Sequence, residues 1–548
     1  MIRNLRAIPL LIALSPILLA QEPVTIHVDA GQTTSRFRPV WNYFGYDEPN
    51  YTYAENGRKL LKELADLSKE PVQVRTHNLL TTGDAVAALK WGSTNAYTED
   101  ASGKPVYNWT IVDRILSTYL SLGIKPFVEI GFMPKALSTH PDPYQHNFPQ
   151  GDVFTGWSYP PTSYEKWSEL VYQWVKHCTA KYGVAEAQSW AWEVWNEPDI
   201  GYWHGTPEEY DKLYDYTVAA VRKALPGAHV GGPASTGPSG KKAAAFLRQF
   251  LEHCSSHDTP LDFITFHAKG HPEFVEGHVV MGITHELQDA VEGFRIVHSF
   301  DKFKNLPIIL SEADPEGCAA CSARTNPANA YRNGDLYPVY TAVAMKALLQ
   351  LAEREQVNLQ GILTWAFEFE GQPYFEGFRT LATNGIDKPI LNFFRMAGLM
   401  TGSIIPVTSI SDVPLDTLMS AGARQHPDVD AMAVRNEHRV AALVWNYRDE
   451  DVLGASANVK LQITGLPATA QQVLINHYRI DRSHSNAYTI WKLLGSPQEP
   501  TSQQRDALEQ ASQLQTLDSP HWVAAKAGAI DLDFSLPLHG LSLVEAFW

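Results

Sequence analysis

The sequence has few cysteines and a deficit of positive charge, and it contains no internal repeat or low-complexity tract. Four cysteines in 548 residues are too few for a disulfide-stabilised scaffold, so a hydrophobic core must stabilise the fold. The 44 Lys and Arg residues are outnumbered by 60 Asp and Glu residues, which gives a formal net charge of −16. Nucleic acids and anionic membranes bind concentrated positive charge, so this balance argues against both as partners and leaves neutral substrates compatible.

The apolar run at the N-terminus is too short for a comfortable membrane span. It covers residues 7–20 and follows a short segment that contains Arg3 and Arg6. A basic segment followed by such a run is typical of a secretory signal peptide. We therefore predict that residues 1–20 are a signal peptide, that the mature protein is exported to the periplasm or beyond the cell, and that it is not stably inserted in a membrane.

Between residues 36 and 400, short β-rich segments alternate with amphipathic helical stretches, which is the pattern of parallel βα units. The predicted strands are 41–46, 72–77, 126–131, 190–195, 229–232, 262–267, 307–311 and 361–367. The predicted helices are 57–68, 110–122, 163–182, 206–225, 241–254, 284–299, 338–355 and 389–400. An alternation of eight strands and eight helices predicts an α/β fold, a closed (β/α)8 TIM barrel spanning residues 36–400.

After residue 400 the sequence changes to β-type alternation with turn signals, which is typical of a β-sandwich. An isolated strand near the N-terminus, residues 24–28, is expected to pair with this region. We therefore predict a discontinuous accessory β-sandwich domain made of residues 22–35 and 401–548. A polar stretch with a short helix interrupts it at residues 484–515.

Polar residues follow several predicted barrel strands at their carboxyl ends, where the chemistry of these barrels takes place. Two glutamates stand out: Glu197, in the segment Trp195-Asn-Glu-Pro-Asp199, and Glu312, which follows the strand 307–311. Two carboxylates held on rigid strands can cleave a glycosidic bond, one as acid/base and one as nucleophile. A lone carboxylate at a strand end more often forms a salt bridge or caps a helix, but two on suitable strands favour catalysis.

The neighbour of Glu197 distinguishes the two roles. Asn196 can donate a hydrogen bond to the sugar hydroxyl next to the anomeric carbon, a contact that strengthens in the transition state. This favours Glu197 as the acid/base and leaves Glu312 as the nucleophile. We expect their surroundings to separate their pKa values, so that one is protonated while the other is ionised.

Further residues at the strand ends are candidates for contacts with the sugar. His77 and His267 can bind hydroxyls or orient the nucleophile, although a histidine at such a place is about as often structural. Trp365 can supply a flat apolar wall for a sugar face. His271 lies four residues after His267, but this spacing favours a metal only on a helix, and the segment has loop character. We predict neither a metal nor an organic cofactor.

Cys318 and Cys321 lie close together just beyond Glu312. A thioredoxin-like redox pair would be expected to open a helix in a small βαβ domain, and a zinc site would need two further ligands nearby. Neither context can be placed in the sequence. In an exported protein we therefore favour a local disulfide that ties the loop.

Short motifs along the chain resemble glycoside hydrolase family 39, which contains β-xylosidases and α-L-iduronidases. The motifs lie at residues 107–109, 125–134, 195–199, 266–267, 385–389, 394–395, 478–481 and 485–488, over nearly the whole mature chain. The resemblance implies a barrel with a sandwich, Glu197 as acid/base and Glu312 as nucleophile. It also implies a sugar pocket that contains His77, Asn196, His267 and Trp365.

Two departures from the β-xylosidase pattern concern the sugar. Lys269 stands where that pattern usually has a tyrosine, and the acidic residues after Trp365 come early, at Glu368 and Glu370. Lys269 can meet a uronate carboxylate, although pairing with Glu312 or Glu368 is the favoured interpretation. We include Lys269 and Glu370 among the predicted substrate-binding residues.

The sequence therefore predicts a retaining, exo-acting β-xylosidase that releases xylose from xylo-oligosaccharides. Long connections at residues 78–109, 132–162 and 313–337 indicate walls around a closed pocket, which favours action at a chain end. Three alternatives stay open: a retaining glycosidase for an α-L-arabinoside or a uronide, a non-catalytic carbohydrate-binding barrel, and a metal-dependent hydrolase. The sequence predicts an oligosaccharide or glycoside as the partner and does not define the oligomeric state.

Overall fold

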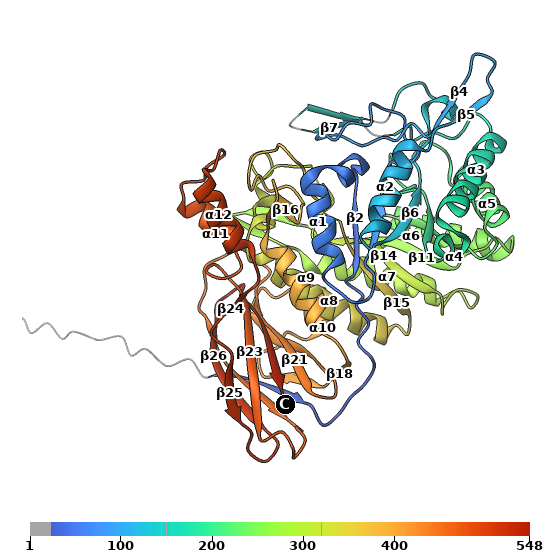
Figure 1. Cartoon of the computed structure of the whole chain (residues 1–548). Coiled ribbons are helices and arrows are strands. Elements are labelled where there is room, and N and C mark those ends of the chain that lie inside the picture. The colour runs from blue at the N-terminus through green and yellow to red at the C-terminus, as the bar shows by residue number, and fades with distance from the viewer. Residues whose placement is uncertain (1–22, 144, 149–150, 155, 319, 366) are drawn as a thin grey trace, which may run out of the picture.

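The computed structural model describes residues 23–548, except residues 144, 149–150, 155, 319 and 366. It contains a (β/α) barrel and, below it in Figure 1, a β domain of two sheets. The predicted signal peptide, residues 1–20, lies outside the described residues. Among the helices of the described part, none combines the length and the apolar character needed to cross a membrane.

Eight parallel strands close into a barrel, and β15 pairs with β2 to complete the ring. In barrel order they are β2 (Tyr43–Tyr46), β3 (Gln73–Thr76), β6 (Lys125–Ile130), β9 (Ala191–Val194), β10 (His229–Ser235), β11 (Phe263–Lys269), β14 (Pro307–Asp314) and β15 (Asn358–Trp365). The predicted TIM barrel is confirmed. Each strand lies where it was predicted, with ends that differ by a few residues.

Helices follow the barrel strands along the chain. They are α1 (Glu55–Ala65), α2 (Thr110–Ser121), α3 (Tyr164–Tyr182), the short α4 (Val184–Gln188), α5 (Pro207–Ala224), α6 (Lys241–Ser256), α7 (Ile283–His298), α8 (Leu336–Arg354) and α9 (Pro389–Leu399). The start of α5 shows how local sequence sets these bounds. Thr206 Oγ1 accepts a hydrogen bond from the Glu209 backbone, and Glu209 accepts one from the Thr206 backbone. This capping box satisfies two amide groups that the helix itself leaves unpaired.

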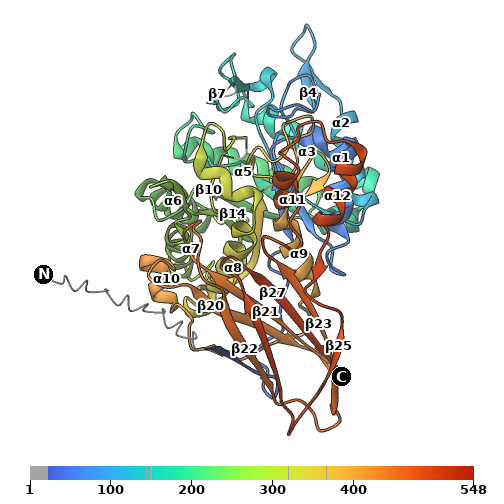
Figure 2. The same ribbon diagram turned by 90° about the vertical axis from the view of Figure 1, so that its left-hand side faces the viewer.

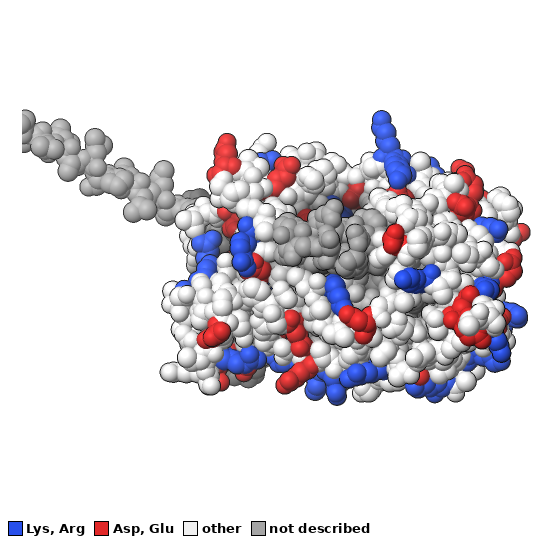
Figure 3. All heavy atoms as spheres, turned by 90° about the horizontal axis from the view of Figure 1, so that it is seen from above, with Lys and Arg blue, Asp and Glu red and all other residues white. Residues whose placement is uncertain are grey.

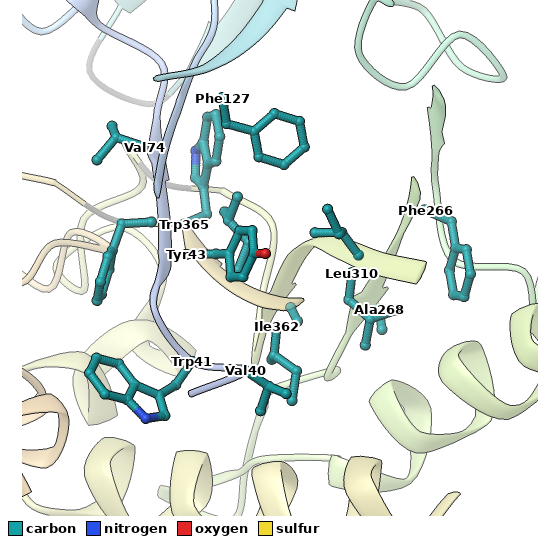
Figure 4. Packing of buried hydrophobic residues seen from close by; sticks show 14 of the residues in the cluster. Val40, Trp41, Tyr43, Val74, Phe127, Phe266, Ala268, Leu310, Ile362 and Trp365 are labelled. Carbon is teal, nitrogen blue, oxygen red and sulfur yellow. The ribbon is translucent and has the colours of Figure 1, made fainter. Parts of the chain in front are cut away.

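The barrel interior below the strand ends is filled by aromatic and branched side chains. The rings of Tyr43 and Phe127 lie 6.5 Å apart, and Phe263 lies 5.8 Å from Phe127. Figure 4 shows Tyr43 and Phe127 with Leu310 of β14 in this packed region. Gly231 makes room for the ring of Phe263, because a side chain at position 231 would overlap that ring. The interior of the barrel is a solid core in the described residues, so a ligand of the barrel would bind at the ends of its strands.

The β domain consists of two sheets that enclose a shared apolar cluster. One sheet contains β1 (Val24–Asp29), β19 (Val407–Ser409), β22 (Ala457–Thr464) and β26 (Ile530–Leu536). The other contains β18 (Ser403–Ile405), β20 (Asp428–Arg435), β21 (Arg439–Tyr447), β23 (Gln472–Ile480), β24 (Gln515–Thr516), β25 (His521–Ala524) and β27 (Leu541–Phe547). Strand β1 runs parallel to β22, with Val24 opposite Val459, so the N-terminal strand lies in a sheet otherwise formed after residue 400.

Short hairpins and helices that the sequence did not reveal extend the loops. The hairpins are β4 (Tyr97–Glu99) with β5 (Pro105–Tyr107), β7 (Gln145–Phe148) with β8 (Gly151–Phe154), β12 (Glu273–Val275) with β13 (His278–Val280), and β16 (Ala382–Thr383) with β17 (Ile386–Asp387). The short helices are η1 (Pro49–Tyr53), η2 (Lys135–Leu137), η3 (Pro327–Asn333) and α10 (Leu415–Ala421). In both ribbon views the β4 and β7 hairpins stand at the end of the barrel remote from the β domain (Figures 1 and 2).

A helical insertion of the β domain reaches the loop that follows β15. It consists of α11 (Ala487–Leu493) and α12 (Ser502–Ser512), which lie beside β16 in Figure 1. Phe375 of the loop packs against Tyr488 and Trp491, with ring centroids 5.4 and 5.2 Å apart. The insertion therefore supports a loop at the same end of the barrel as the predicted catalytic residues.

Candidate active site

A cavity of about 300 Å³ lies at the carboxyl ends of the barrel strands. Its lining contains Asp47, Glu48, His77, Trp91, Asn196, Glu197, Ile200, Tyr202, Glu312, Gly317, Cys318, Ala320, Trp365 and Arg379. Both predicted catalytic glutamates are therefore brought to one cavity, together with three of the predicted substrate-binding residues. Seen from above, acidic and basic side chains are interspersed over this end of the molecule, with uncharged surface between them (Figure 3).

The backbone that presents Glu197 is held in an unfavourable conformation. Trp195 and Glu197 both have positive φ angles, 73° and 45°, in the left-handed region that residues with a side chain rarely adopt. Such residues cost about 1–3 kcal/mol each and persist only where the surroundings impose them. Here the Glu197 backbone N–H donates to Ala234 O at 2.8 Å, and its Oε1 lies 2.8 Å from His267 Nδ1. The strained turn therefore fixes where the carboxylate points.

Glu312 is surrounded by positive charge. Its Oε2 lies 2.6 Å from Lys269 Nζ and 3.5 Å from an Arg379 nitrogen, and its Oε1 lies 3.4 Å from Arg75 Nη1. Burial raises the pKa of Glu312, but the charge of Lys269 and of the surrounding cations outweighs burial and holds this pKa well below its ordinary value. Glu312 is therefore a buried carboxylate that stays ionised.

His267 stands between the two glutamates. Its Nδ1 contacts Glu197, and its Nε2 lies 3.8 Å from Glu312 Oε1. The side chain is fully buried and comes from β11, which pairs with β14 so that His267 lies opposite Glu312. A single imidazole thus contacts Glu197 directly and lies between the two carboxylates.

Asp47 holds two of the predicted pocket residues in place. Its Oδ1 lies 3.0 Å from His77 Nδ1, and its Oδ2 accepts a hydrogen bond of 3.1 Å from Trp365 Nε1. The Trp365 ring lies over the backbone of Gly45, where any side chain would overlap it. Burial disfavours the charged ring of His77, but the charge of Glu129 and the contact with Asp47 outweigh burial and raise the pKa of His77 to about 9. The imidazole is therefore a further positive charge at this wall.

Arg75 joins the site although the sequence did not single it out. The side chain is completely buried, and Nε donates to Glu193 at 2.5 Å while Nη2 lies 3.0 Å from Glu129. Nη2 also donates to Asn196 Oδ1 at 3.0 Å, which leaves the amide nitrogen of Asn196 to donate to a ligand. The available sequence signal was a set of charged residues, Arg75, Glu129 and Glu193, inside apolar strands.

Of the predicted substrate-binding residues Lys269 and Glu370, the structure places the first beside Glu312 and the second at the start of α1. Lys269 pairs with Glu312, one of the two partners favoured from the sequence. It also lies 3.7 Å from Asp314. The structure does not bring Glu370 to the cavity: its Oε1 accepts hydrogen bonds from the backbones of Asn56 at 2.8 Å and Gly57 at 3.1 Å. The first amides of α1 have no partner within the helix, so they attract this carboxylate.

The loop after β14 supplies another wall. Cys318 and Cys321 are joined by a disulfide, and the Cys318 backbone N–H donates to Glu316 Oε1 at 2.8 Å. Arg379, which was also not predicted, donates to the Glu316 carbonyl and lies 3.3 Å from Asp314. Arg379 thereby connects the disulfide loop to the surroundings of Glu312. In the part of the chain that the structure describes, no three His, Cys, Asp or Glu residues are grouped so that they could hold a metal ion.

A closed barrel with two carboxylates in one cavity at the ends of its strands defines the class of barrel glycoside hydrolases. The model of glycosyl hydrolases family 39 matches residues 24–525. The β-xylosidase of Geobacillus stearothermophilus is 27% identical over 469 residues, which cover 81% of this chain and 82% of that protein. The α-L-iduronidase of Mus musculus is 23% identical over 577 residues, covering 97% and 82%.

A solved structure gives the same result at the level of the fold. The β-xylosidase of Caulobacter crescentus CB15 superimposes with a TM-score of 0.75 at 21% identity, covering 95% of this chain and 99% of that one. The chain belongs to glycosyl hydrolases family 39. Both the predicted family and the predicted glycoside hydrolase activity are confirmed.

Proposed function

We propose that the protein is a retaining, exo-acting β-xylosidase that releases xylose from xylo-oligosaccharides. The observation that carries the proposal is the difference in charge around two glutamates in one cavity. Glu312 is held ionised by Lys269, Arg75 and Arg379, as a nucleophile must be. Glu197 has no such group of cations and contacts only His267 among the charged and titratable side chains described, which suits an acid/base.

The reaction proceeds in two displacements. Glu197 gives its proton to the leaving oxygen while the Glu312 carboxylate attacks the anomeric carbon, so that a glycosyl ester forms on Glu312. Glu197, now ionised, takes a proton from water, and the resulting hydroxide displaces Glu312 with net retention. Asn196 is oriented by Arg75 to hold the neighbouring sugar hydroxyl. Trp365, fixed by Asp47, supplies an apolar wall.

Two observations support a β-xyloside at the end of a chain as the substrate. The cavity is small, at about 300 Å³, and aromatic side chains such as Trp91 and Tyr202 line it beside the carboxylates. The relative from Geobacillus stearothermophilus, which matches most of the chain, is a β-xylosidase. A pentose without a charged group needs only hydroxyl partners, and the site offers one in the amide nitrogen of Asn196.

A uronide such as an α-L-iduronide is the second candidate, favoured by two cations. Arg379 lines the cavity and Lys269 lies next to it, and α-L-iduronidases are among the relatives. Both cations are, however, already paired with Glu312 and Asp314. A substrate carboxylate would have to compete with these two acids, so we prefer the xyloside.

The test is a panel of aryl glycosides: the β-D-xyloside, the α-L-arabinoside and the α-L-iduronide. We expect the highest kcat/KM on the xyloside, and we expect β-xylose as the first product in a proton NMR time course. Activity on the iduronide alone would contradict the proposed substrate. A first product of α-xylose would contradict retention.

A further inference from the structure

Glu48 is a cavity residue that the reaction described above does not use. It lies two residues after the end of β2, lines the cavity next to Asp47, and keeps only 6% of its surface exposed. Among the residues that the structure describes, no other side chain forms a hydrogen bond or an ion pair with its carboxyl group, which interacts with its own backbone N–H. Burying a carboxyl group without a side-chain partner costs free energy, so such a group in a cavity points to a ligand that completes it.

The neighbouring Asp47 shows what a structural carboxylate looks like at this place. Both of its oxygens are engaged, one by His77 and the other by the Trp365 indole. Asp47 therefore has little capacity left for a substrate. Glu48, one residue further along the chain, meets no other side chain in this way and keeps hydrogen-bonding capacity for a ligand.

The protonation state of Glu48 suits a hydroxyl partner. Burial, and next the charge of Asp47, raise the pKa of Glu48 well above its ordinary value. A neutral carboxylic acid offers one O–H donor and one carbonyl acceptor. A sugar hydroxyl can accept from the first and donate to the second.

The surroundings of Glu48 also disfavour a second anion. Tyr51 lies next to it, and burial, followed by the charges of Glu48, Glu370 and Glu368, raises the pKa of Tyr51. Acid groups therefore surround Tyr51, although of these only Glu48 lines the cavity. A uronate carboxylate directed there would meet the charge of Asp47, which already raises the pKa of Glu48, whereas a hydroxyl would not.

We propose that Glu48 is a specificity-determining residue that binds a hydroxyl group of the sugar in the cavity. The assignment rests on the proposed function, because it takes an uncharged pentose as the occupant. It adds to Asn196, which follows β9, a second hydroxyl contact at the end of β2. It also explains why the site favours a neutral sugar although Lys269 and Arg379 are close.

The experiment compares Glu48→Ala and Glu48→Gln with a matched control, Glu292→Gln, on the outer helix α7. Each variant is assayed on the aryl β-xyloside and on its 2-, 3- and 4-deoxy analogues. We expect Glu48→Ala to lower kcat/KM on the xyloside by roughly 10- to 100-fold. Glu48→Gln retains a donor and an acceptor and should lose less, and Glu292→Gln should match the wild type.

The deoxy series separates a substrate contact from a structural role. On the analogue that lacks the bound hydroxyl, wild type and Glu48→Ala should have nearly equal kcat/KM, because the contact is absent in both. An equal loss on every analogue would show that Glu48 acts only through the structure and would overturn the assignment. So would a Glu48→Ala variant with wild-type kinetics.

Failure of the proposed function shows separately, as a wild-type protein inactive on every xyloside. In that case calorimetric titration of wild type and Glu48→Ala with free xylose supplies the second readout. Weaker binding by Glu48→Ala keeps the assignment. Equal binding, or no binding by either protein, overturns it, provided that circular dichroism shows both to be folded.

Discussion

The two sides of the cavity give the same residue type opposite surroundings. Glu312 lies among three Lys and Arg side chains, and 7% of its side chain is exposed. Glu197 contacts His267, and 16% of its side chain is exposed. Neighbouring cations hold the pKa of Glu312 well below its ordinary value, Glu197 has no such cations, and the proposed roles of the two residues rest on this difference. The comparison makes the roles testable, because substitution of each glutamate should cause a different loss of activity.

The largest effect is expected from removing the nucleophile. Glu312→Gly should lower kcat on the aryl xyloside by roughly 10⁴- to 10⁶-fold, because no covalent intermediate can form. Added azide can enter the vacated space and attack the anomeric carbon, so activity should return with an inverted glycosyl azide as product. Product NMR checks this result.

The matched control is Glu437→Gly, which changes an exposed glutamate of the β domain and should leave kcat unchanged. If Glu312→Gly kept wild-type activity without azide, the charge comparison would have named the wrong nucleophile.

Removing the acid/base should give a smaller loss that depends on the leaving group. Glu197→Ala should lower kcat/KM by about 10²- to 10⁴-fold on xylobiose, whose leaving oxygen needs a proton. With a 2,4-dinitrophenyl leaving group, which needs none, glycosyl transfer to Glu312 should remain fast. Azide should then yield the retained glycosyl azide. A loss of the same size on both substrates would argue against an acid at position 197.

The barrel and the two glutamates could be predicted because both are marked by patterns of neighbouring residues in the sequence. Alternating strand and helix patterns determine the barrel, and in the sequence Glu197 and Glu312 stand at the carboxyl ends of apolar segments, which became β9 and β14. The short hairpins were missed, since three-residue strands such as β4 carry too little pattern. Residues 144, 149–150 and 155 in one of these loops lie outside the described residues.

The partners of the glutamates could not be predicted in the same way. Arg75 reaches Glu129 and Glu193 only after the barrel closes, because three separate strands supply them. Glu370 was expected in the sugar pocket, but the amides of α1 lie closer to it in the folded chain. Helix ends and buried ion pairs depend on tertiary distances, which a single sequence does not give.

The electrostatic part of the comparison can be tested by Lys269→Met. The depressed pKa of Glu312 keeps the nucleophile ionised at acidic pH, and activity falls only as the pH drops through that pKa. Without the ammonium group at 2.6 Å this pKa rises, so the acidic limb of kcat/KM should move up by about one pH unit or more. The measurement is kcat/KM against pH.

Lys304→Met is the matched control, because Lys304 pairs with the exposed Asp301 far from the cavity. An acidic limb that is identical in the wild type and in Lys269→Met would contradict the account of Glu312. If the substrate is instead a uronide, Lys269→Met should raise KM for it more than for the xyloside, and this would reverse the preference between the two candidates.

The smallest effect is expected at Glu370, an acid close to the cavity that serves the fold. Its carboxylate satisfies the first amides of α1, and loss of such a helix cap costs about 1 kcal/mol. In a chain of this size we expect Glu370→Ala to lower Tm by about 1–2 °C and to leave KM unchanged. Differential scanning calorimetry measures the Tm, and kinetics on the xyloside measure the KM. A raised KM with an unchanged Tm would return Glu370 to the sugar pocket and would show that closeness to the cavity, rather than hydrogen-bond partners, decides which acids bind substrate.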